Sequence, residues 1–335
     1  MKFVVLGAGA IGGLLGAHLV RVGEDVTMIA RGPQLAAIRA RGLRITGQGG
    51  DFTVHPECTD ALTPIRSADV VFVTVKAHSL PPLAERLGAE LGPKTSLFTG
   101  QNGIPWWFFE DFGGPLTGTR LESVDPGGRL SRNIDPGRVV GCVIYLAARL
   151  QDPGIVEHVD GNRISLGEPS GYPSSRTQEV SAALKRAGFK APVQPRIRSE
   201  IWLKLLGNAA FNPISALTRA TLKEITEDRG AVELVRAIME EVDLIGRRIG
   251  IETPIGIERR IQGAARVGDH KTSMLQDVEA GRPLELGATG WALVELAGTL
   301  ELRVPHLEAV LACANLLDRQ RRRAALPTPA VEVPS

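Results

Sequence analysis

Short hydrophobic runs alternate with helical patterns over the first two hundred residues. Residues 2–6 predict a short buried strand, and the continuous apolar run at 69–75 is typical of a central parallel strand, which is covered on both faces. Residues 95–99 are expected to form the next strand. After the first run, apolar residues recur every three or four positions, from Ile11 to Leu19. This alternation predicts an α/β fold with an N-terminal Rossmann-type doubly wound sheet, in which helices connect parallel strands. Further strands are expected at 25–30, 138–146, 154–158 and 163–166, a helix around 35–38 and another over 174–187, and an edge strand at 189–193.

The pattern changes near Ile197. Strand patterns vanish after Glu200, and helical spacing follows at 201–217, 231–249, 284–302 and 305–321. We therefore predict a nucleotide-binding domain at residues 1–197 and an all-helical C-terminal domain at residues 198–322. The remaining residues, 323–335, carry three prolines and no hydrophobic period, so a disordered tail is expected there.

Composition narrows the functional class. The 335 residues suffice for two domains, and the 43% hydrophobic fraction allows a sizeable core. A net charge of +2 and 4% aromatic residues favour neither nucleic acid nor a membrane surface as partner. The three cysteines are far apart and outside any Cys/His cluster, so neither a metal site nor a disulfide framework is expected. With no targeting leader or membrane-length apolar run, a cytoplasmic protein with a small-molecule partner is predicted.

The strongest chemical signal is a glycine motif directly after the first predicted strand. The sequence from Gly7 to Gly12 is G-x-G-x-x-G and leads into a helix, which is the context of a dinucleotide-binding turn. Gly7 would allow the tight turn, Gly9 the close approach of a pyrophosphate, and Gly12 the packing of helix on strand. A glycine-rich turn without a ligand is the weaker alternative.

The end of the second predicted strand indicates which dinucleotide binds. Folds that bind NAD usually place an acidic residue there to hydrogen-bond the ribose, whereas this chain has Ala30 followed by Arg31. A guanidinium can bind a 2′-phosphate through two hydrogen bonds, and a carboxylate would repel it. The sequence therefore favours NADPH, although Arg31 could also be a solvated loop residue.

Polar residues follow two of the predicted strands. Lys76 comes directly after the strand at 69–75, and Asn102 follows the strand at 95–99. The carboxyl ends of parallel strands form the ligand-binding edge of such sheets. Lys76 could equally be an exposed loop lysine, and Asn102 with Gly103 could form a simple turn.

Three polar residues share one face of the first helix of the C-terminal domain. Lys204, Asn208 and Asn212 lie four residues apart among strongly apolar neighbours. A partly buried lysine has a lowered pKa and suits proton donation near neutral pH. The alternative is a solvated stripe opposite the core. Further along, Ser273 and Glu285 fit either ligand binding or the start of a helix, and their spacing does not separate these roles.

Taken together, these motifs resemble the ketopantoate reductase (2-dehydropantoate 2-reductase) family. The resemblance extends over roughly residues 1–321 and depends on the following segments together: 7–13, Ala30-Arg31, Val75-Lys76, 101–104, Lys204-Leu205 with Asn208 and Asn212-Pro213, and 272–277 with Glu285. Each motif alone is weakly specific.

The resemblance implies NADPH-dependent reduction of 2-dehydropantoate to pantoate, a step toward coenzyme A. It implies that NADPH contacts Gly7, Gly9, Ala10, Ile11, Gly12, Arg31, Lys76, Asn102 and Ala147. Lys204 would be the general acid, and Glu285 would hold Lys204 or accept a hydrogen bond from the substrate. Asn102, Asn208, Asn212 and Ser273 would bind the substrate. A homodimer is compatible with the sequence.

The chain departs from the family pattern at several positions. Gly287 stands where the family usually has an acidic residue, and the segments 105–109 and 123–128 resemble an enlarged loop. Trp106 and Trp107 could widen an apolar substrate pocket, which we favour, or form a dimer contact. A bulkier 2-oxo acid substrate and a non-catalytic NADP sensor are therefore alternatives; a sensor would not need Lys204 or Glu285.

Overall fold

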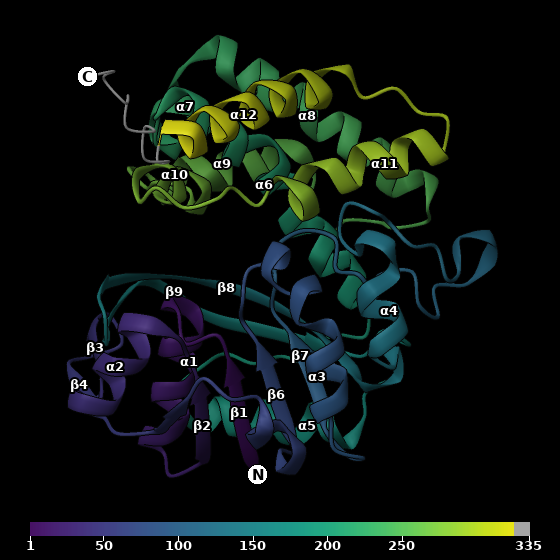
Figure 1. Cartoon of the computed structure of the whole chain (residues 1–335). Helices are drawn as coiled ribbons and strands as arrows, with labels where there is room; N and C mark the ends of the chain where they lie inside the picture. The colour runs from purple at the N-terminus through teal and green to yellow at the C-terminus, as the bar shows by residue number, and fades with distance from the viewer. Residues whose placement is uncertain (325–335) are drawn as a thin grey trace, which may run out of the picture. The chain divides into compact units, whose positions relative to one another are not determined.

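The computed structural model describes residues 1–324 and divides the chain into two compact units (Figure 1). The first unit is Met1–Trp202, and the second begins at Leu203. This division falls five residues beyond the predicted boundary between residues 197 and 198. Most of the predicted tail lies outside the described residues, but Arg323 and Ala324 belong to the last helix rather than to the tail.

The first unit is built around a nine-stranded sheet with the order β4-β3-β9-β8-β7-β6-β1-β2-β5. Its strands are β1 (Lys2–Leu6), β2 (Asp25–Ile29), β3 (Leu43–Gly47), β4 (Phe52–Val54), β5 (Glu57–Thr59), β6 (Val70–Val73), β7 (Ser96–Thr99), β8 (Val139–Asp152) and β9 (Ile155–Gly167). The six strands that lie side by side as β5-β2-β1-β6-β7-β8 are parallel, as the alternating pattern predicts. The sheet is nevertheless mixed, because β9 runs antiparallel to β8 and β4 antiparallel to β3.

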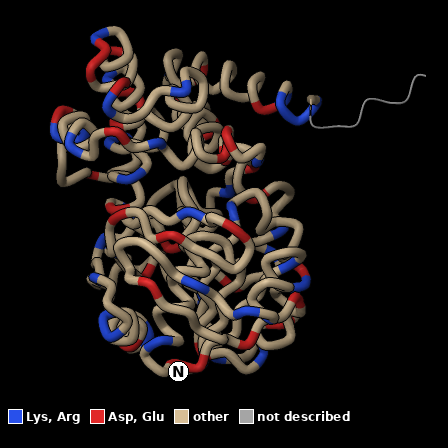
Figure 2. The backbone as a smooth tube through the Cα atoms, turned by 90° about the vertical axis from the view of Figure 1, so that its left-hand side faces the viewer, with Lys and Arg blue, Asp and Glu red and all other residues tan. Residues whose placement is uncertain are grey.

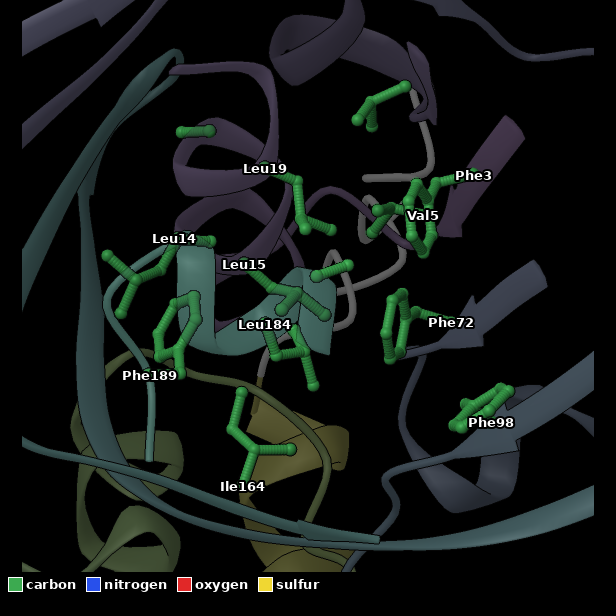
Figure 3. Packing of buried hydrophobic residues seen from close by; sticks show 14 of the residues in the cluster. Phe3, Val5, Leu14, Leu15, Leu19, Phe72, Phe98, Ile164, Leu184 and Phe189 are labelled. Carbon is green, nitrogen blue, oxygen red and sulfur yellow. The ribbon is translucent and has the colours of Figure 1, made fainter. Parts of the chain in front are cut away.

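Helices and short 3₁₀ segments connect these strands. The helices are α1 (Ala10–Arg21), α2 (Gly32–Arg41), α3 (Ala84–Glu90), α4 (Arg129–Asn133) and α5 (Ser175–Arg186). Leucines of α1 and Leu184 of α5 face Phe3, Val5 and Phe72 of the sheet in one core cluster (Figure 3). Val4 and Leu6 point to the opposite face and are also buried. Both faces of the central sheet are therefore covered, which explains the continuous apolar strands.

Two predicted strand assignments differ from the structure. The expected strands at 154–158 and 163–166 are one strand, β9, which pairs with the long β8 across register shifts between Tyr145 and Ala148. The Asp-Gly-Asn sequence at 160–162 imitates a turn, and the irregular pairing keeps the strand continuous there. The expected edge strand at 189–193 is wrong: it makes only isolated bridges, and Pro192 has no N–H to donate.

The second unit contains only helices among its described residues, as predicted. After α6 (Ile197–Thr218), which spans the division, come α7 (Leu222–Glu227), α8 (Arg229–Arg248), α9 (Ile257–Val267), α10 (Ser273–Glu279), α11 (Ala292–Thr299) and α12 (Pro305–Ala324). The predicted helix at 284–302 is shorter in the structure, where a π-helix at Gly287–Trp291 continues directly into α11 and the helix ends at Thr299. Gly290 fits tightly in this segment, since a Cβ there would overlap Leu311 of α12.

Charge is spread over each unit rather than concentrated on one face. Basic and acidic residues are interspersed along the backbone in both units (Figure 2). Among the described residues, no helix has the length and hydropathy needed to cross a membrane.

Candidate nucleotide-binding and catalytic sites

The glycine turn lies at the carboxyl edge of the sheet. Strand register aligns Leu6 with Ile29 of β2 and with Val73 of β6, so the segments after these strands leave the sheet together. Gly7 has a φ of +107°, and its N–H donates to the carbonyl oxygen of Ile29 at 3.1 Å. This conformation turns the chain from β1 into α1 within three residues.

The other two motif glycines have opposite environments. A Cβ on Gly12 would overlap the carbonyl oxygen of Gly7 and the hydroxyl of Thr74, so α1 packs against the turn only without a side chain. Gly9 has open space where its Cβ would stand. It is also the N-cap of α1, and no side chain caps that helix within the described residues. The N–H groups at the start of α1, including those of Ala10 and Ile11, are thus available to an anion.

A pocket of about 220 Å³ opens beside this turn. It is lined by Gly7, Gly9 and Arg31, and its apolar walls include Leu62, Leu83 and Leu150. Apolar walls next to a glycine turn with open backbone N–H groups suit the adenosine part of a dinucleotide. The structure thus places Arg31 at the same pocket as the glycine motif, whereas sequence distance alone could not show that they meet.

Gln34 connects this turn to the β8–β9 hairpin. Its amide nitrogen donates to the carbonyl oxygen of Ala8 at 2.7 Å, and its amide oxygen accepts from the N–H of Gly154 at 2.9 Å. Gly154 lies between β8 and β9, and Leu150 from the same hairpin lines the pocket. The long hairpin therefore forms part of the nucleotide pocket.

Lys76 and Asn102 follow neighbouring parallel strands, as predicted. Val73 of β6 pairs with Thr99 of β7, so both residues lie three positions beyond the same edge, and both are half-buried. The Gln101 amide donates to the carbonyl oxygens of Val73 and Val75, which ties the two loops together. Ala147 lies six residues, or about 20 Å along the strand, beyond Gly141, the partner of Thr99.

Helix α6 carries the polar face that the spacing predicts. Lys204 and Asn208 are half-buried, and Asn212 is only 7% exposed. The first turns of α6 are held within the first unit, because Glu200 accepts from both Arg163 and Tyr145. Arg198 donates to the carbonyl oxygens of Phe108, Pro169 and Glu110. The lysine therefore belongs to a helix whose start has fixed partners.

Ser273 and Glu285 lie on separate segments of the second unit. The suggested helix cap at Ser273 is wrong, because Thr272 is the N-cap of α10 and its hydroxyl accepts from the N–H of Leu275. Ser273 is exposed, whereas Glu285 is half-buried and precedes the π-helix. The carbonyl oxygen of Glu285 accepts from the hydroxyl of Thr289 at 2.5 Å. Capping therefore does not account for Ser273.

The expectation that Trp106 and Trp107 widen a substrate pocket or form a dimer contact is wrong. Trp107 is fully buried and its indole N–H donates to the Thr99 hydroxyl at 2.8 Å, while Trp106 is only 7% exposed. Phe108 packs against the ring of Trp202. This aromatic segment is therefore part of the core of the first unit. Its run of large apolar residues in a loop suggested a surface role, because the sequence does not show what covers it.

Sequence reasoning also missed three residues of the nucleotide pocket. Gln34, Asp60 and Arg86 line it together with Arg31. Asp60 follows β5, which carried no clear strand pattern, and Arg86 lies on α3, a helix of seven residues. No spacing rule connects these residues with the glycine motif, so only the folded arrangement identifies them.

Comparison with known proteins agrees with this geometry. Residues 3–106 match the family described as ketopantoate reductase PanE/ApbA, and residues 196–318 match its C-terminal region, ketopantoate reductase PanE/ApbA C terminal. A 2-dehydropantoate 2-reductase from Mesorhizobium japonicum is 47% identical over 96% of this chain and 99% of its own length. A candidate ketopantoate reductase from Ralstonia solanacearum MolK2 superposes with a TM-score of 0.90 at 38% identity, covering 96% of this chain and 98% of that one.

A more distant structure shares the fold alone. D-mandelate dehydrogenase, solved with NADH and anilino(oxo)acetate, has a TM-score of 0.82 at 17% identity, with 96% of this chain and 100% of that chain covered. The two matched regions cover both the nucleotide turn and the helix that carries Lys204. The resemblance drawn from the motifs is therefore confirmed, and the chain belongs to the ketopantoate reductase family of oxidoreductases.

Proposed function

We propose that this protein reduces 2-dehydropantoate to pantoate with NADPH. The observation that carries the choice of cofactor is the pocket in which Arg31 lies beside the glycine turn, with Ala30 instead of an acidic residue at the end of β2. The choice of substrate is supported by the 2-dehydropantoate 2-reductase from Mesorhizobium japonicum, which aligns over 96% of this chain. We also place the reaction in the cytoplasm and propose a homodimer, whose mass light scattering would measure.

The residues of the first unit fit a dinucleotide. The open space at Gly9 and the uncapped start of α1 suit a pyrophosphate, and the pocket with its leucines suits adenosine. NADPH supplies a hydride to the carbonyl carbon of the substrate. Lys76 and Asn102, which leave the same sheet edge, would border the nicotinamide, and Ala147 of β8 would also contact the cofactor.

The residues of α6 would complete the reaction. Hydride addition leaves negative charge on the carbonyl oxygen, and Lys204 would donate the proton that turns this oxygen into the hydroxyl of pantoate. Its ammonium charge would also stabilise the developing alkoxide. Asn208, Asn212 and Ser273 would orient the carboxylate and hydroxyl of the substrate, and Glu285 would hold Lys204 or accept a substrate hydrogen bond.

The test is an NADPH-oxidation assay with a panel of 2-oxo acids. We expect rapid loss of NADPH with 2-dehydropantoate, and slower loss with an aryl 2-oxo acid such as phenylglyoxylate. Faster turnover of the aryl acid would mean that 2-dehydropantoate is not the preferred substrate. No turnover with any 2-oxo acid would favour an NADP sensor. Repeating the assay with NADH separates the choice of cofactor from the choice of substrate.

A further inference from the structure

A second arginine faces the nucleotide pocket. Arg86 of α3 lines the same pocket as Arg31, although 55 positions separate them in the sequence. Within residues 1–324, neither guanidinium has a hydrogen bond or an ion pair. Two guanidinium groups without a protein partner at one pocket can both donate hydrogen bonds to an anionic group of a ligand.

The natural partner of Arg86 is already engaged. Glu90 lies four residues further along α3, where an ion pair along the helix would be expected. Both carboxylate oxygens of Glu90 instead accept from Arg66, at 2.5 and 3.3 Å. Ala84 and Leu87 are buried and pack α3 against the core. The helix is therefore fixed, and the side chain of Arg86 lines the pocket.

The charges around the pocket also depend on Arg86. Asp60 is the acidic residue of the lining, and its charge offsets that of Arg31. With Arg86 included, two basic residues oppose one acidic residue, and the lining carries a net positive charge. The second arginine therefore favours a second anionic group of the ligand, beyond the one that the start of α1 can bind.

We infer that Arg86 is a specificity-determining residue that binds the ribose 2′-phosphate of NADPH together with Arg31. This inference rests on the proposed function, because it assumes that the pocket holds the adenosine end of a dinucleotide. The phosphate would accept hydrogen bonds from two guanidinium groups that approach from α2 and from α3. Arg86 takes no part in the transfer of hydride or proton.

The test measures binding of two nucleotide fragments by isothermal titration calorimetry, without substrate or turnover. Adenosine 2′,5′-bisphosphate carries the 2′-phosphate, and 5′-AMP lacks it. We expect the Arg86→Ala variant to lose about tenfold or more in affinity for the bisphosphate, as for a lost charge-assisted hydrogen bond, while its affinity for 5′-AMP changes by less than about twofold. Arg86→Lys should keep part of the preference for the bisphosphate over 5′-AMP. Lysine keeps the positive charge but cannot donate the paired hydrogen bonds of a guanidinium.

Arg129→Ala is the matched control. Arg129 is exposed on α4 and outside the pocket lining, so this variant removes the same charge at another place. It should bind both fragments like the wild type. If Arg86→Ala keeps the full preference for the bisphosphate, Arg86 does not bind the 2′-phosphate, while NADPH remains the proposed cofactor. If the wild-type protein itself binds both fragments equally, the NADPH proposal fails, and the inference fails with it.

Discussion

Single residues decide the chemistry, and Lys204 is the residue with the most specific expected role. The sequence shows its spacing from Asn208 and Asn212, and the structure confirms that the three share one helix with partial burial. The surroundings of each side chain were not predictable, because contacts with residues distant in sequence determine them. For the same reason, the sequence did not show that Arg86 lines the nucleotide pocket or that Trp107 is buried in the core.

The Lys204→Ala variant should lower kcat by about two to four orders of magnitude, the range for a lost general acid. NADPH binding, measured by fluorescence titration, should stay near the wild-type value, because Lys204 lies in the second unit and outside the nucleotide pocket. Lys223→Ala, which removes an exposed lysine of α7, is the control and should leave kcat unchanged. A fully active Lys204→Ala variant would rule out the proton-donor role.

His18 is a second residue whose role only the structure shows. The sequence places it on a helix face, but its Nδ1–H donates to the carbonyl oxygen of Ala187, and its ring lies 6.5 Å from that of His158. Within the described residues, Nε2 of His18 and Nδ1 of His158 are buried without partners. Burial lowers the pKa of His18 below its usual value, and the charges of His158 and Arg21 lower it further, against the opposing hydrogen bond to Ala187.

Stability should therefore fall in mild acid. The unfolded chain protonates His18 near pH 6.5, whereas the folded protein resists protonation until its lower pKa is reached. Above pH 6.5 this residue leaves stability unchanged. Between the two pKa values it costs up to about 1.4 kcal/mol for each pH unit, and below the folded pKa the loss is complete.

Urea denaturation of the wild type and of His18→Gln between pH 7.5 and 5 would measure this loss. The His18→Gln variant should depend less on pH, whatever its stability at pH 7.5. The matched variant His55→Gln removes an exposed histidine and should keep the wild-type slope. Equal slopes for all three proteins would contradict the assignment.

At the scale of elements, the helices and the central strands were predictable, and the irregular pieces were not. The boundaries of β1 and β2 follow directly from the apolar runs, because both sheet faces are covered. The β8–β9 hairpin was not anticipated as one unit, since its register shifts disguise the period of two. The π-helix before α11 likewise has no sequence signal, as its packing on α12 is a tertiary contact.

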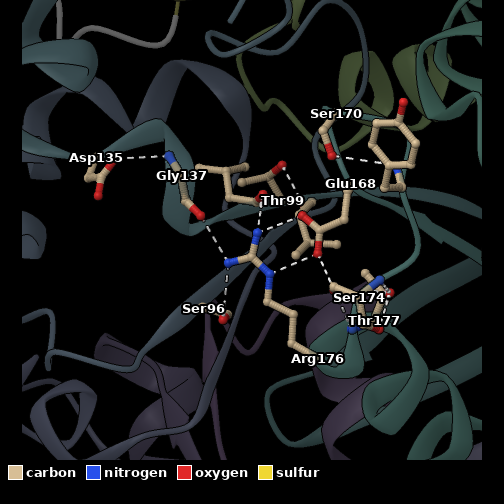
Figure 4. Close-up of polar contacts among 12 residues, drawn as sticks. Ser96, Thr99, Asp135, Gly137, Glu168, Ser170, Ser174, Arg176 and Thr177 are labelled. Atoms are coloured by element: carbon tan, nitrogen blue, oxygen red, sulfur yellow. Dashed lines mark hydrogen bonds and ion pairs between the residues drawn. The ribbon is translucent and has the colours of Figure 1, made fainter. Parts of the chain in front are cut away.

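The junction between β9 and α5 depends on one buried carboxylate. Glu168 is 6% exposed and accepts from Arg176 at 2.8 and 2.6 Å, and from the Ser174 hydroxyl (Figure 4). Ser174 in turn caps α5, and Arg176 also donates to the carbonyl oxygen of Gly137. Loss of this carboxylate would leave a partly buried guanidinium without its anion.

Glu168→Ala should lower the free energy of unfolding by about 3 kcal/mol, near the low end for a broken buried pair because Arg176 keeps some exposure. Urea denaturation would measure the change. Glu157→Ala is the control: it removes the carboxylate of the more exposed Arg149–Glu157 pair and should cost less than about 1 kcal/mol. Similar losses in both variants would contradict the special role of Glu168.

At the scale of the whole molecule, the sequence was sufficient for the fold class and the family, because the glycine motif and the helical second half are local patterns. The residues that line the nucleotide pocket could not be predicted from the sequence, since they come from segments between Leu6 and Leu150. Such a pocket couples ligand binding to the stability of the entire first unit.

NADPH should therefore raise the melting temperature more than NADH at equal concentration. A ligand at one hundred times its dissociation constant stabilises the folded state by about 2.7 kcal/mol, and the weaker ligand contributes less. Differential scanning fluorimetry with both cofactors would measure the two shifts. Larger stabilisation by NADH would reverse the predicted preference.

The bridge made by Gln34 makes the glycine turn depend on one side-chain amide. A carboxylate in place of this amide, as in Gln34→Glu, would remove the N–H that donates to Ala8 and would add a negative charge beside the proposed pyrophosphate site. Gly154 could still donate to the new carboxylate, so the hairpin would stay attached while the turn lost its support. Gln34→Glu should therefore weaken NADPH binding in a fluorescence titration, and unchanged affinity would show that the turn does not need this amide.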